Sequence, residues 1–124
     1  SLTKEMAQFL FQSSLIITPC RVSRDDIVGQ GWIEVFLKQA NQNIKKAPIL
    51  TVLNGVNKRS SILSHVIEQL KEDGIQVAET CISQRVCFAE TNVNKISVIG
   101  YNKQATEEIV DLTNEALNLI KSEA

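Results

Sequence analysis

Short apolar runs alternate along this chain with segments of helical periodicity, and this alternation constrains the fold more than any other feature. Leu15–Pro19 and Pro48–Leu53 have the length and apolar content of buried strands, and Gln76–Ile82 has the pattern of a third, less apolar strand. Helices between consecutive strands imply crossover connections and a mainly parallel sheet. The sequence therefore predicts an α/β fold with three layers, α/β/α.

Helical spacing marks the segments between and around these strands. A capping box at Ser23–Asp26 predicts the start of a helix that continues to about Asn43. A third helix is expected to end at Gly74 in a left-handed cap, and the last helix is expected to carry Glu107 and Glu108 in its first turn, where acidic groups suit the helix dipole. The side chains expected to face the core are Leu2, Met6, Phe9 and Leu10 in the first helix, Trp32, Ile33, Phe36, Leu37 and Ala40 in the second, Ile62, Leu63, Val66, Ile67 and Leu70 in the third, and Ala105, Ile109, Leu112, Ala116 and Ile120 in the last.

Composition bounds the size and the surroundings of the fold. A chain of 124 residues with 44% hydrophobic residues suffices for one domain, residues 1–124, and not for two. Its net charge of -1 excludes a global field that would draw it to nucleic acid, so any DNA contact requires a local patch. No apolar run approaches the length of about 20 residues that spans a bilayer. For this reason no membrane contact is expected. Three cysteines without metal-ligand spacing indicate a reduced, cytoplasmic protein.

The ends of the predicted strands mark the candidate site. In parallel α/β sheets, ligands bind at the carboxyl ends of the strands. Those ends are Pro19–Arg21, Leu53–Gly55 and Ile82–Arg85 in this chain. The three segments are therefore predicted to converge on one edge of the sheet.

Common catalytic patterns are missing from the sequence. No Gly-Lys pair exists, so the chain has no phosphate-binding P-loop, and the pair Gly29 and Gly31 lacks the third glycine of the dinucleotide fingerprint. His65 lies beside an apolar helical stripe, away from any strand end, and is interpreted as a surface residue. Asp25 and Asp26 are of the residue type that binds magnesium, but helix capping explains them more simply.

One run of the sequence is similar to a known family. Within Thr80–Glu90 the residues Thr80, Ile82, Arg85, Phe88 and Glu90 stand at the spacing T-x-I-x-x-R-x-x-F/Y-x-E. This run resembles a stretch of the plasmid partition ATPases of the ParA type, which belong with MinD and Soj to the deviant-Walker P-loop NTPases.

Further segments of the chain resemble the same family in the same order. Ser14–Pro19 is similar to its D-L-V-I-I-P strand, with Ser14 in place of an acidic residue. Val22–Asp26 is similar to its x-S-P-x-D helix start, with arginine in place of proline, and Leu50–Asn54 to the strand whose terminal Asn lies near adenine. Lys95–Val98 is similar to its G-x-x-V segment, with lysine near the usual glycine. The resemblance covers nearly the whole chain.

The resemblance implies an ATPase that acts in plasmid or chromosome partition. Such proteins bind ATP or ADP with Mg²⁺, form nucleotide-dependent homodimers, coat DNA nonspecifically on the bacterial nucleoid and meet a ParB-like centromere-binding adaptor. The chain resembles only their C-terminal half, because Ser1–Thr3 would follow the Walker B motif and the Walker A loop is missing. This chain alone is therefore not expected to hydrolyse ATP or to contribute catalytic or metal-binding residues.

The resemblance also assigns roles to individual residues. Asn54 would contact the adenine, and Ile82, Ser83 and Gln84 would line the base pocket. A guanidinium offers paired donors to phosphate oxygens, so Arg85 is the leading candidate for DNA contact. The basic side chains that would extend this DNA-binding patch are Lys58, Arg59, Lys95 and Lys103.

Each of these assignments has a structural alternative. Asn54 is also a residue type that is favoured before a turn. Arg85 could form an ion pair with Glu79 or Glu90. Lys58 and Arg59 could be solvated charges of a loop. For the whole chain, the alternatives are a non-catalytic α/β binding module and an oligomerisation domain. A half-domain without the central strands of the family would expose a strand edge and apolar helix faces, and would associate with itself or with a partner.

Overall fold

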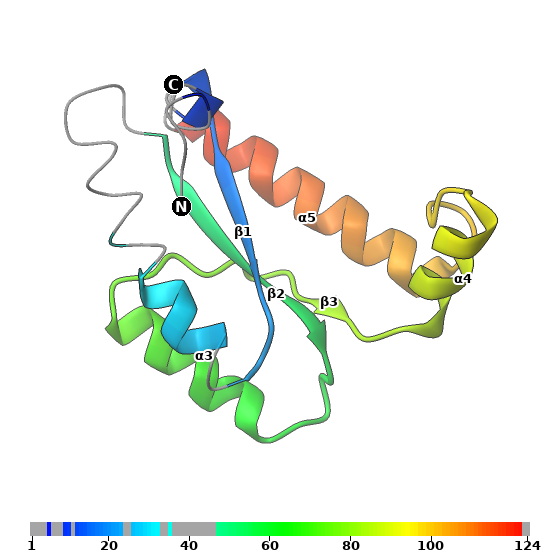
Figure 1. Cartoon of the computed structure of the whole chain (residues 1–124), viewed down its shortest axis with the longest axis horizontal. Helices are drawn as coiled ribbons and strands as arrows, with labels where there is room; N and C mark the ends of the chain where they lie inside the picture. The colour runs from blue at the N-terminus through cyan, green and yellow to red at the C-terminus, as the bar shows by residue number, and fades with distance from the viewer. Residues whose placement is uncertain are drawn as a thin grey trace.

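The computed structural model describes residues 5, 9–10, 12–23, 26–32, 35 and 47–122. Its elements follow the order β1 (Ile16–Cys20), β2 (Ile49–Val56), α3 (Ile62–Glu72), β3 (Ile82–Ser83), α4 (Val86–Asn94) and α5 (Lys103–Ser122), and residues 26–32 between β1 and β2 are helical (Figure 1). The predicted α/β class is confirmed: the chain forms a small domain of helices and a parallel sheet. Among the described helices, none is long and apolar enough to cross a membrane.

The sheet of the described chain has three parallel strands in the order β1-β2-β3. β1 pairs with β2 from Ile16 opposite Ile49 to Cys20 opposite Leu53, so the two strands run in the same direction and end at the same edge. Figure 1 shows them side by side through the middle of the domain. β2 has a strand on each side, and this position explains its continuous run of buried residues.

β2 continues beyond the end that the sequence predicts. Asn54 and Gly55 were expected to close the strand, but both belong to β2, which ends at Val56. The pairing with β3 shifts register between Asn54 and Val56, and Gly55 has a φ of +68°. A glycine in the left-handed region allows the strand to accommodate an irregular residue and to continue. The strand-to-helix loop therefore begins at Asn57.

β3 is much shorter than predicted. Gln76–Ile82 was expected to be a strand, but only Ile82–Ser83 forms one, and the earlier part contributes a single isolated bridge to β2. The carboxylate of Glu115 in α5 accepts hydrogen bonds from the backbone N–H groups of Glu79 (2.8 Å) and Thr80 (3.0 Å). Two backbone donors in the middle of the segment are thus satisfied by a side chain instead of by β2.

α4 lies between the predicted third strand and the predicted last helix, in a stretch for which the sequence predicts no helix. Only Cys87 and Thr91 are buried in it, and the Thr91 hydroxyl donates a hydrogen bond to the Cys87 carbonyl (2.8 Å). The helix ends at Lys95, whose φ of +55° is a left-handed conformation that usually belongs to glycine. Two buried residues make a periodic pattern too weak to predict this helix.

α3 and α5 agree with their predicted positions, with two differences. Gly74 follows α3 with a φ of +79°, which confirms the left-handed cap, but Ile62 of the predicted buried stripe is 57% exposed at the start of the helix. The predicted core-facing stripe of α5 is buried or half-buried. α5 begins at Lys103, so Glu107 and Glu108 do not lie in its first turn, and the expected interaction with the helix dipole is wrong for both. Glu108 is instead buried, with only 6% of its surface exposed.

The core lies on both sides of β2. Leu53 packs with Leu70 of α3, whereas Leu50 packs with Ile109 of α5. Because neighbouring side chains of a strand alternate between its faces, α3 and α5 contact opposite faces of the sheet. Gln30 joins residues 26–32 to the first two strands, since its side-chain N–H group donates hydrogen bonds to the hydroxyls of Thr18 and Thr51, both at 2.8 Å.

The apolar face predicted for the second helix is not buried as expected. Trp32 was expected in the core but is 73% exposed, and Val28 and Val35 are also exposed. The fully buried side chain of residues 26–32 is Gln30, so this helix turns its polar network and not Trp32 toward the sheet. Phe9, which was expected to face the core in the first helix, is 74% exposed as well, so this expectation is also wrong. Other predicted core positions lie outside the described residues, namely Leu2, Met6, Ile33, Phe36, Leu37 and Ala40.

Candidate binding site at the strand ends

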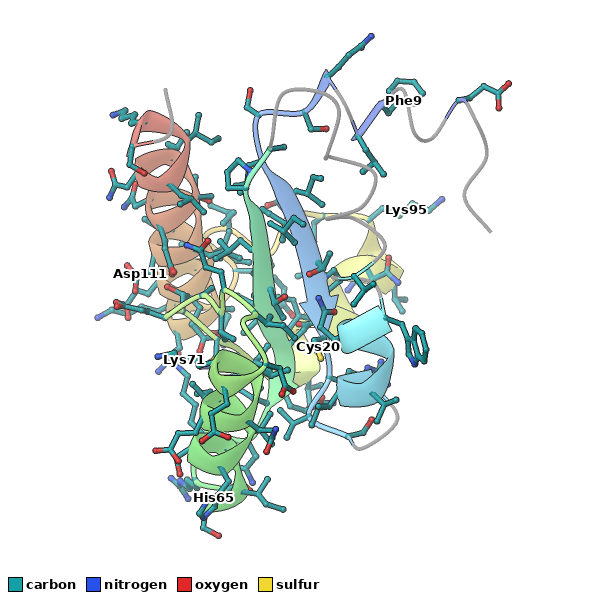
Figure 2. All side chains as sticks on the ribbon, turned by 90° about the vertical axis from the view of Figure 1, so that its left-hand side faces the viewer. Phe9, Cys20, His65, Lys71, Lys95 and Asp111 are labelled. Atoms are coloured by element: carbon teal, nitrogen blue, oxygen red, sulfur yellow. The ribbon has the colours of Figure 1, made fainter. Side chains whose placement is uncertain are left out.

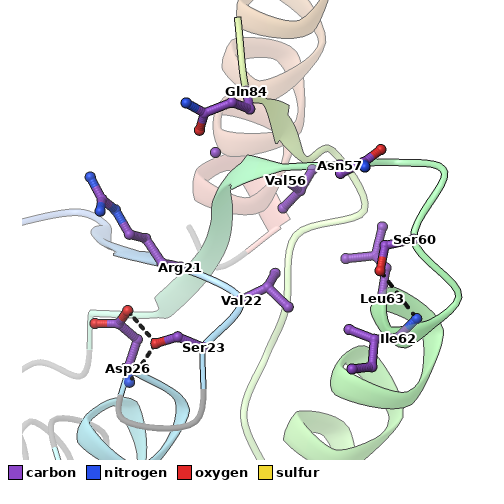
Figure 3. A pocket seen from close by; sticks show the side chains of 11 residues that line it. Arg21, Val22, Ser23, Asp26, Val56, Asn57, Ser60, Ile62, Leu63 and Gln84 are labelled. Carbon is purple, nitrogen blue, oxygen red and sulfur yellow. Dashed lines mark hydrogen bonds between the residues drawn. The ribbon is translucent and has the colours of Figure 1, made fainter.

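A pocket of about 490 Å³, here called the strand-end pocket, lies at the carboxyl ends of the strands (Figure 3). It is lined by Arg21–Ser23 after β1, by Gly55–Asn57 at the end of β2 and by Gln84 after β3, together with Asp26, Ser60, Ile62 and Leu63. Its volume falls within the range of about 300–1,000 Å³ that is typical of small-molecule sites. The predicted convergence of three strand ends is confirmed.

The wall that follows β1 carries two charges of opposite sign. Arg21 is exposed, and its side chain has no ion pair among the described residues. The backbone N–H of Asp26 donates to the Ser23 hydroxyl (3.2 Å), which in turn donates to the Asp26 carboxylate (2.6 Å), as the dashed lines of Figure 3 mark. The first bond is the serine half of the predicted capping box. The other half is not formed, because the Ser23 N–H donates to the Arg21 carbonyl (3.0 Å), and the carboxylate is held at the rim of the pocket by the Ser23 hydroxyl.

The opposite wall is formed by Gln84 and the end of β2. The backbone N–H of Gln84 donates to the carbonyl of Val56 (2.9 Å), and this bond holds the residue beside β2. A Cβ atom at Gly55 would lie 3.0 Å from Oε1 of Gln84, so a larger residue there would displace the end of this side chain. The φ of +68° at Gly55 is the stronger reason for glycine at this position.

A charged cluster, here called the Glu108 cluster, lies behind this wall. Oε1 of Glu108 accepts hydrogen bonds from the Ser83 N–H (3.2 Å) and from Nε of Arg85 (3.4 Å). Oε2 accepts from the Ser83 hydroxyl (2.6 Å) and from Nζ of Lys58 (2.7 Å). The carboxylate side chain is 7% exposed, whereas the Lys58 and Arg85 side chains are 55% and 27% exposed. One buried anion therefore binds two cations that keep contact with solvent.

The surroundings of Glu108 keep its carboxylate ionised. Burial alone raises the pKa of Glu108, but the hydrogen bonds from Lys58, Ser83 and Arg85 outweigh this effect and lower its pKa to about 2. Burial also raises the pKa of the Cys81 thiol, which senses the charges of Lys58 and Glu108. The Glu108 carboxylate is thus negatively charged at neutral pH, between two cations.

Of the four residues predicted to bind a base, only Gln84 lines the pocket. The Ser83 hydroxyl is bonded to Glu108, and Ile82 is buried in the core that faces α5. Asn54 is exposed within β2 and is not among the lining residues, whereas Asn57 is. The strand continues past Asn54, and this continuation places the later asparagine at the pocket. A polar residue directly after a strand is the signal by which Asn57 could have been found.

Two of the predicted DNA-binding side chains lie together, and the others are separate. Lys58 and Arg85 meet at Glu108, so the intramolecular partner of Arg85 is neither Glu79 nor Glu90. Arg59 is exposed beside this pair. Lys95 follows α4 and points away from the body of the domain in Figure 2, and Lys103 begins α5; both are exposed.

The remaining chemically reactive side chains lie outside the strand-end pocket. His65 is exposed on α3, as predicted (Figure 2). Cys20, Cys81 and Cys87 are buried free thiols. In the described part of the chain, no group of three His, Cys, Asp or Glu side chains is close enough to hold a metal ion. Asp25, which was weighed as a magnesium ligand, lies outside the described residues.

No protein-family model matches the chain, and no curated protein shows significant similarity to it.

Proposed function

We propose that the chain is the C-terminal part of a ParA-type partition ATPase and that its strand-end pocket receives the adenine end of ATP or ADP. One observation carries this proposal: Arg21, Gly55, Asn57 and Gln84 come from three separate segments and line one pocket at the carboxyl ends of parallel strands. The side-chain amides of Asn57 and Gln84 offer the donors and acceptors that a base edge requires. Apolar side chains of the same pocket give the base a surface to pack on.

The residues of this chain fit the base of a nucleotide better than its phosphates. Gly55 keeps the backbone accessible beside Gln84, because a Cβ atom would fill this space. Phosphate binding requires a P-loop, and the sequence has no Gly-Lys pair. Hydrolysis with Mg²⁺, in which water would take the terminal phosphoryl group and ADP would leave, is therefore assigned to the assembled ParA-like ATPase. The role of this chain is to bind and orient the base.

The finer features of the family belong to the same proposal. The contact of α3 and α5 with opposite faces of β2 supports a three-layer arrangement like that of P-loop NTPases. Nonspecific DNA binding is proposed for Arg85, Lys58, Arg59, Lys95 and Lys103, and the partial exposure of the first two supports it. Homodimerisation, binding of a ParB-like adaptor and a place on the bacterial nucleoid complete the proposed function.

Titration of the labelled chain with adenosine and with ATP tests base binding directly. Two-dimensional NMR spectra of the ¹⁵N-labelled protein should show shifts at the amides of Gly55, Asn57 and Gln84, with adenosine as effective as ATP because the phosphates find no P-loop. Gly55→Ala should weaken the shifts because the new Cβ would lie 3.0 Å from Gln84 Oε1 and displace this side chain, and because alanine is strained at a φ of +68°. Gly29→Ala is the matched control, since no atom lies within 4 Å of its added Cβ.

Two outcomes of this titration would overturn the proposal. One is the absence of any shift at saturating adenosine. The other is unchanged binding by both Gly55→Ala and Gln84→Ala. The second of these variants changes an exposed side chain, so it keeps the test valid if the positive φ of Gly55 makes the first variant unstable.

A second function, self-association, is favoured by the edge position of β1 and by exposed apolar side chains in the segments before and after it. Phe9, Trp32 and Val28 are 74%, 73% and 57% exposed, and β1 lies at one end of the strand order in the described chain. An unpaired strand edge can pair with another chain, and exposed apolar side chains can be buried in such a contact. Analytical ultracentrifugation over a range of concentrations should show a dimer that Trp32→Ser weakens. A monomer at every concentration would reject this second function and leave base binding unaffected.

A further inference from the structure

Two of the segments that line the strand-end pocket are attached to one carboxylate of α5. Ser83 and Arg85, the two neighbours of Gln84, each donate to Glu108. In the segment after β2, Lys58 directly follows Asn57 and also donates to Glu108, at 2.7 Å. The two amide residues that line the pocket are thus each next to a residue that Glu108 binds.

We propose that Glu108 is a positioning residue for the strand-end pocket. It holds Gln84 and Asn57 in place by binding the residues next to them in the chain. The inference rests on the proposed base binding, but it concerns a residue that does not line the pocket. Glu108 acts from the far side of the wall, and a ligand in the pocket does not need to touch it.

The shortness of β3 explains why the pocket needs this anchor. β3 is two residues long, and after it only the bond from the Gln84 N–H to the Val56 carbonyl (2.9 Å) ties the segment to β2. A strand this short supplies few backbone hydrogen bonds. The Glu108 carboxylate adds a bond to the backbone N–H of Ser83 (3.2 Å) and a short bond to its hydroxyl (2.6 Å), directly before Gln84. Hydrogen bonds to a charged acceptor are stronger than neutral ones, so this carboxylate provides much of the anchoring.

The loop between β2 and α3 is anchored in the same way. The described bonds within this loop are local: the Arg59 N–H donates to the Asn57 side chain (3.1 Å) and the Ser60 N–H to the Asn57 carbonyl (3.0 Å). The bond from Lys58 to Glu108 connects the loop to α5. A single side chain therefore connects both segments, the one that holds Gln84 and the one that holds Asn57, to α5.

Glu115 provides a matched control on the same helix. Its carboxylate also accepts two backbone N–H groups, those of Glu79 and Thr80, but it does not contact any neighbour of a pocket residue. The comparison of Glu108→Gln with Glu115→Gln separates a positioning role from a general structural one. Each variant keeps the size of the side chain and replaces a charged acceptor oxygen with an N–H donor.

Adenosine binding, followed by NMR, gives the first measurement. Glu108→Gln should weaken it by about tenfold or more, whereas Glu115→Gln should change it by less than about twofold. Ser83→Ala removes the 2.6 Å bond but leaves the carboxylate with both cations, so it should give an intermediate loss and remains informative if Glu108→Gln fails to fold. Binding by Glu108→Gln and Ser83→Ala at wild-type strength, or an equal loss in Glu115→Gln, would overturn the positioning role.

Hydrogen exchange in the ligand-free protein gives the second measurement. The Gln84 N–H should exchange about tenfold faster or more in Glu108→Gln, with the Leu53 N–H in the core unchanged and Glu115→Gln like the wild type. Wild-type protein that binds neither adenosine nor ATP would reject the proposed function, and the exchange rate of Gln84 would then still decide whether Glu108 holds this wall. An unchanged Gln84 exchange rate in both Glu108→Gln and Ser83→Ala rejects the inference.

Discussion

Two glutamates of α5, about two turns apart, accept backbone N–H groups from the segment between α3 and α4, and their surroundings differ. Glu115 is half-buried and binds two consecutive N–H groups, where it interrupts the predicted third strand. Glu108 is buried and binds the Ser83 N–H and hydroxyl together with two cations, where that strand ends. The same type of side chain thus binds only backbone groups at position 115 and binds two cations as well at position 108.

The difference between Glu108 and Glu115 shows how a helix can determine the geometry of a neighbouring irregular segment. Between Gln76 and Arg85 the chain has few strand bonds of its own, and side chains of α5 replace them. At Glu115 the replacement serves the backbone only. At Glu108 it also neutralises part of the charge of Lys58 and Arg85 beside the strand-end pocket. The energetic weight of the two contacts should differ accordingly.

The largest expected effect is the loss of stability in Glu108→Ala compared with Glu115→Ala. Removal of Glu108 leaves the Ser83 N–H without its acceptor and two cations without their counterion, so we expect a loss of about 3 kcal/mol in the free energy of unfolding. Glu115→Ala removes an acceptor from a more accessible position and should cost about 1 kcal/mol. Urea unfolding of both variants measures the two values. Equal losses would show that the charged cluster adds nothing to backbone capping.

The second prediction concerns pH and tests whether the charge of Glu108 is responsible. Its pKa is about 2 in the folded protein against an ordinary value of 4.5, and a lowered folded-state pKa contributes stability above the unfolded pKa. That contribution, about 3 kcal/mol, should be complete above about pH 4.5 and lost as the pH falls toward about 2. The groups that face this carboxylate are Lys58, Arg85, Ser83 and Cys81.

Unfolding of wild-type protein and Glu108→Ala between pH 7 and pH 2 measures this contribution. The stability difference between the two proteins should be constant above about pH 5 and shrink as the carboxylate takes up a proton. A difference that does not change with pH would mean that packing, and not the charge, makes Glu108 different from Glu115.

Sequence reasoning recovers the regular part of this molecule because its signals are local. Buried apolar runs gave the positions of β1 and β2, and the glycine at position 74 gave the end of α3. The parallel order followed from the alternation of elements, and the convergence of Arg21, Gly55 and Gln84 followed from the parallel order. These features depend on spacing and on backbone geometry alone.

The parts that could not be predicted depend on contacts between distant residues. A glutamate in a helix is usually solvated, so nothing local distinguishes Glu108 from the exposed Glu107 beside it. Glu115 shortens β3 by binding the Thr80 N–H, although the two residues are 35 positions apart in the sequence. Trp32 has the spacing of a core residue, but Gln30 takes the buried position through its bonds to two strands. In each case a polar contact overrides the hydrophobic pattern.

The smallest expected effect sharpens the comparison within the Glu108 cluster. Lys58→Met removes an ammonium whose side chain is 55% exposed, while the Ser83 donors and Arg85 continue to bind the carboxylate. Water screens an exposed ion pair, so the loss in unfolding free energy should stay below about 1 kcal/mol, smaller than that of Glu115→Ala or similar to it. A double-mutant cycle with Glu108→Ala measures the coupling between the two side chains. Coupling above about 2 kcal/mol would mean that the ammonium dominates this cluster, whereas weak coupling assigns the excess weight of Glu108 over Glu115 to Ser83 and Arg85, the two residues that flank Gln84.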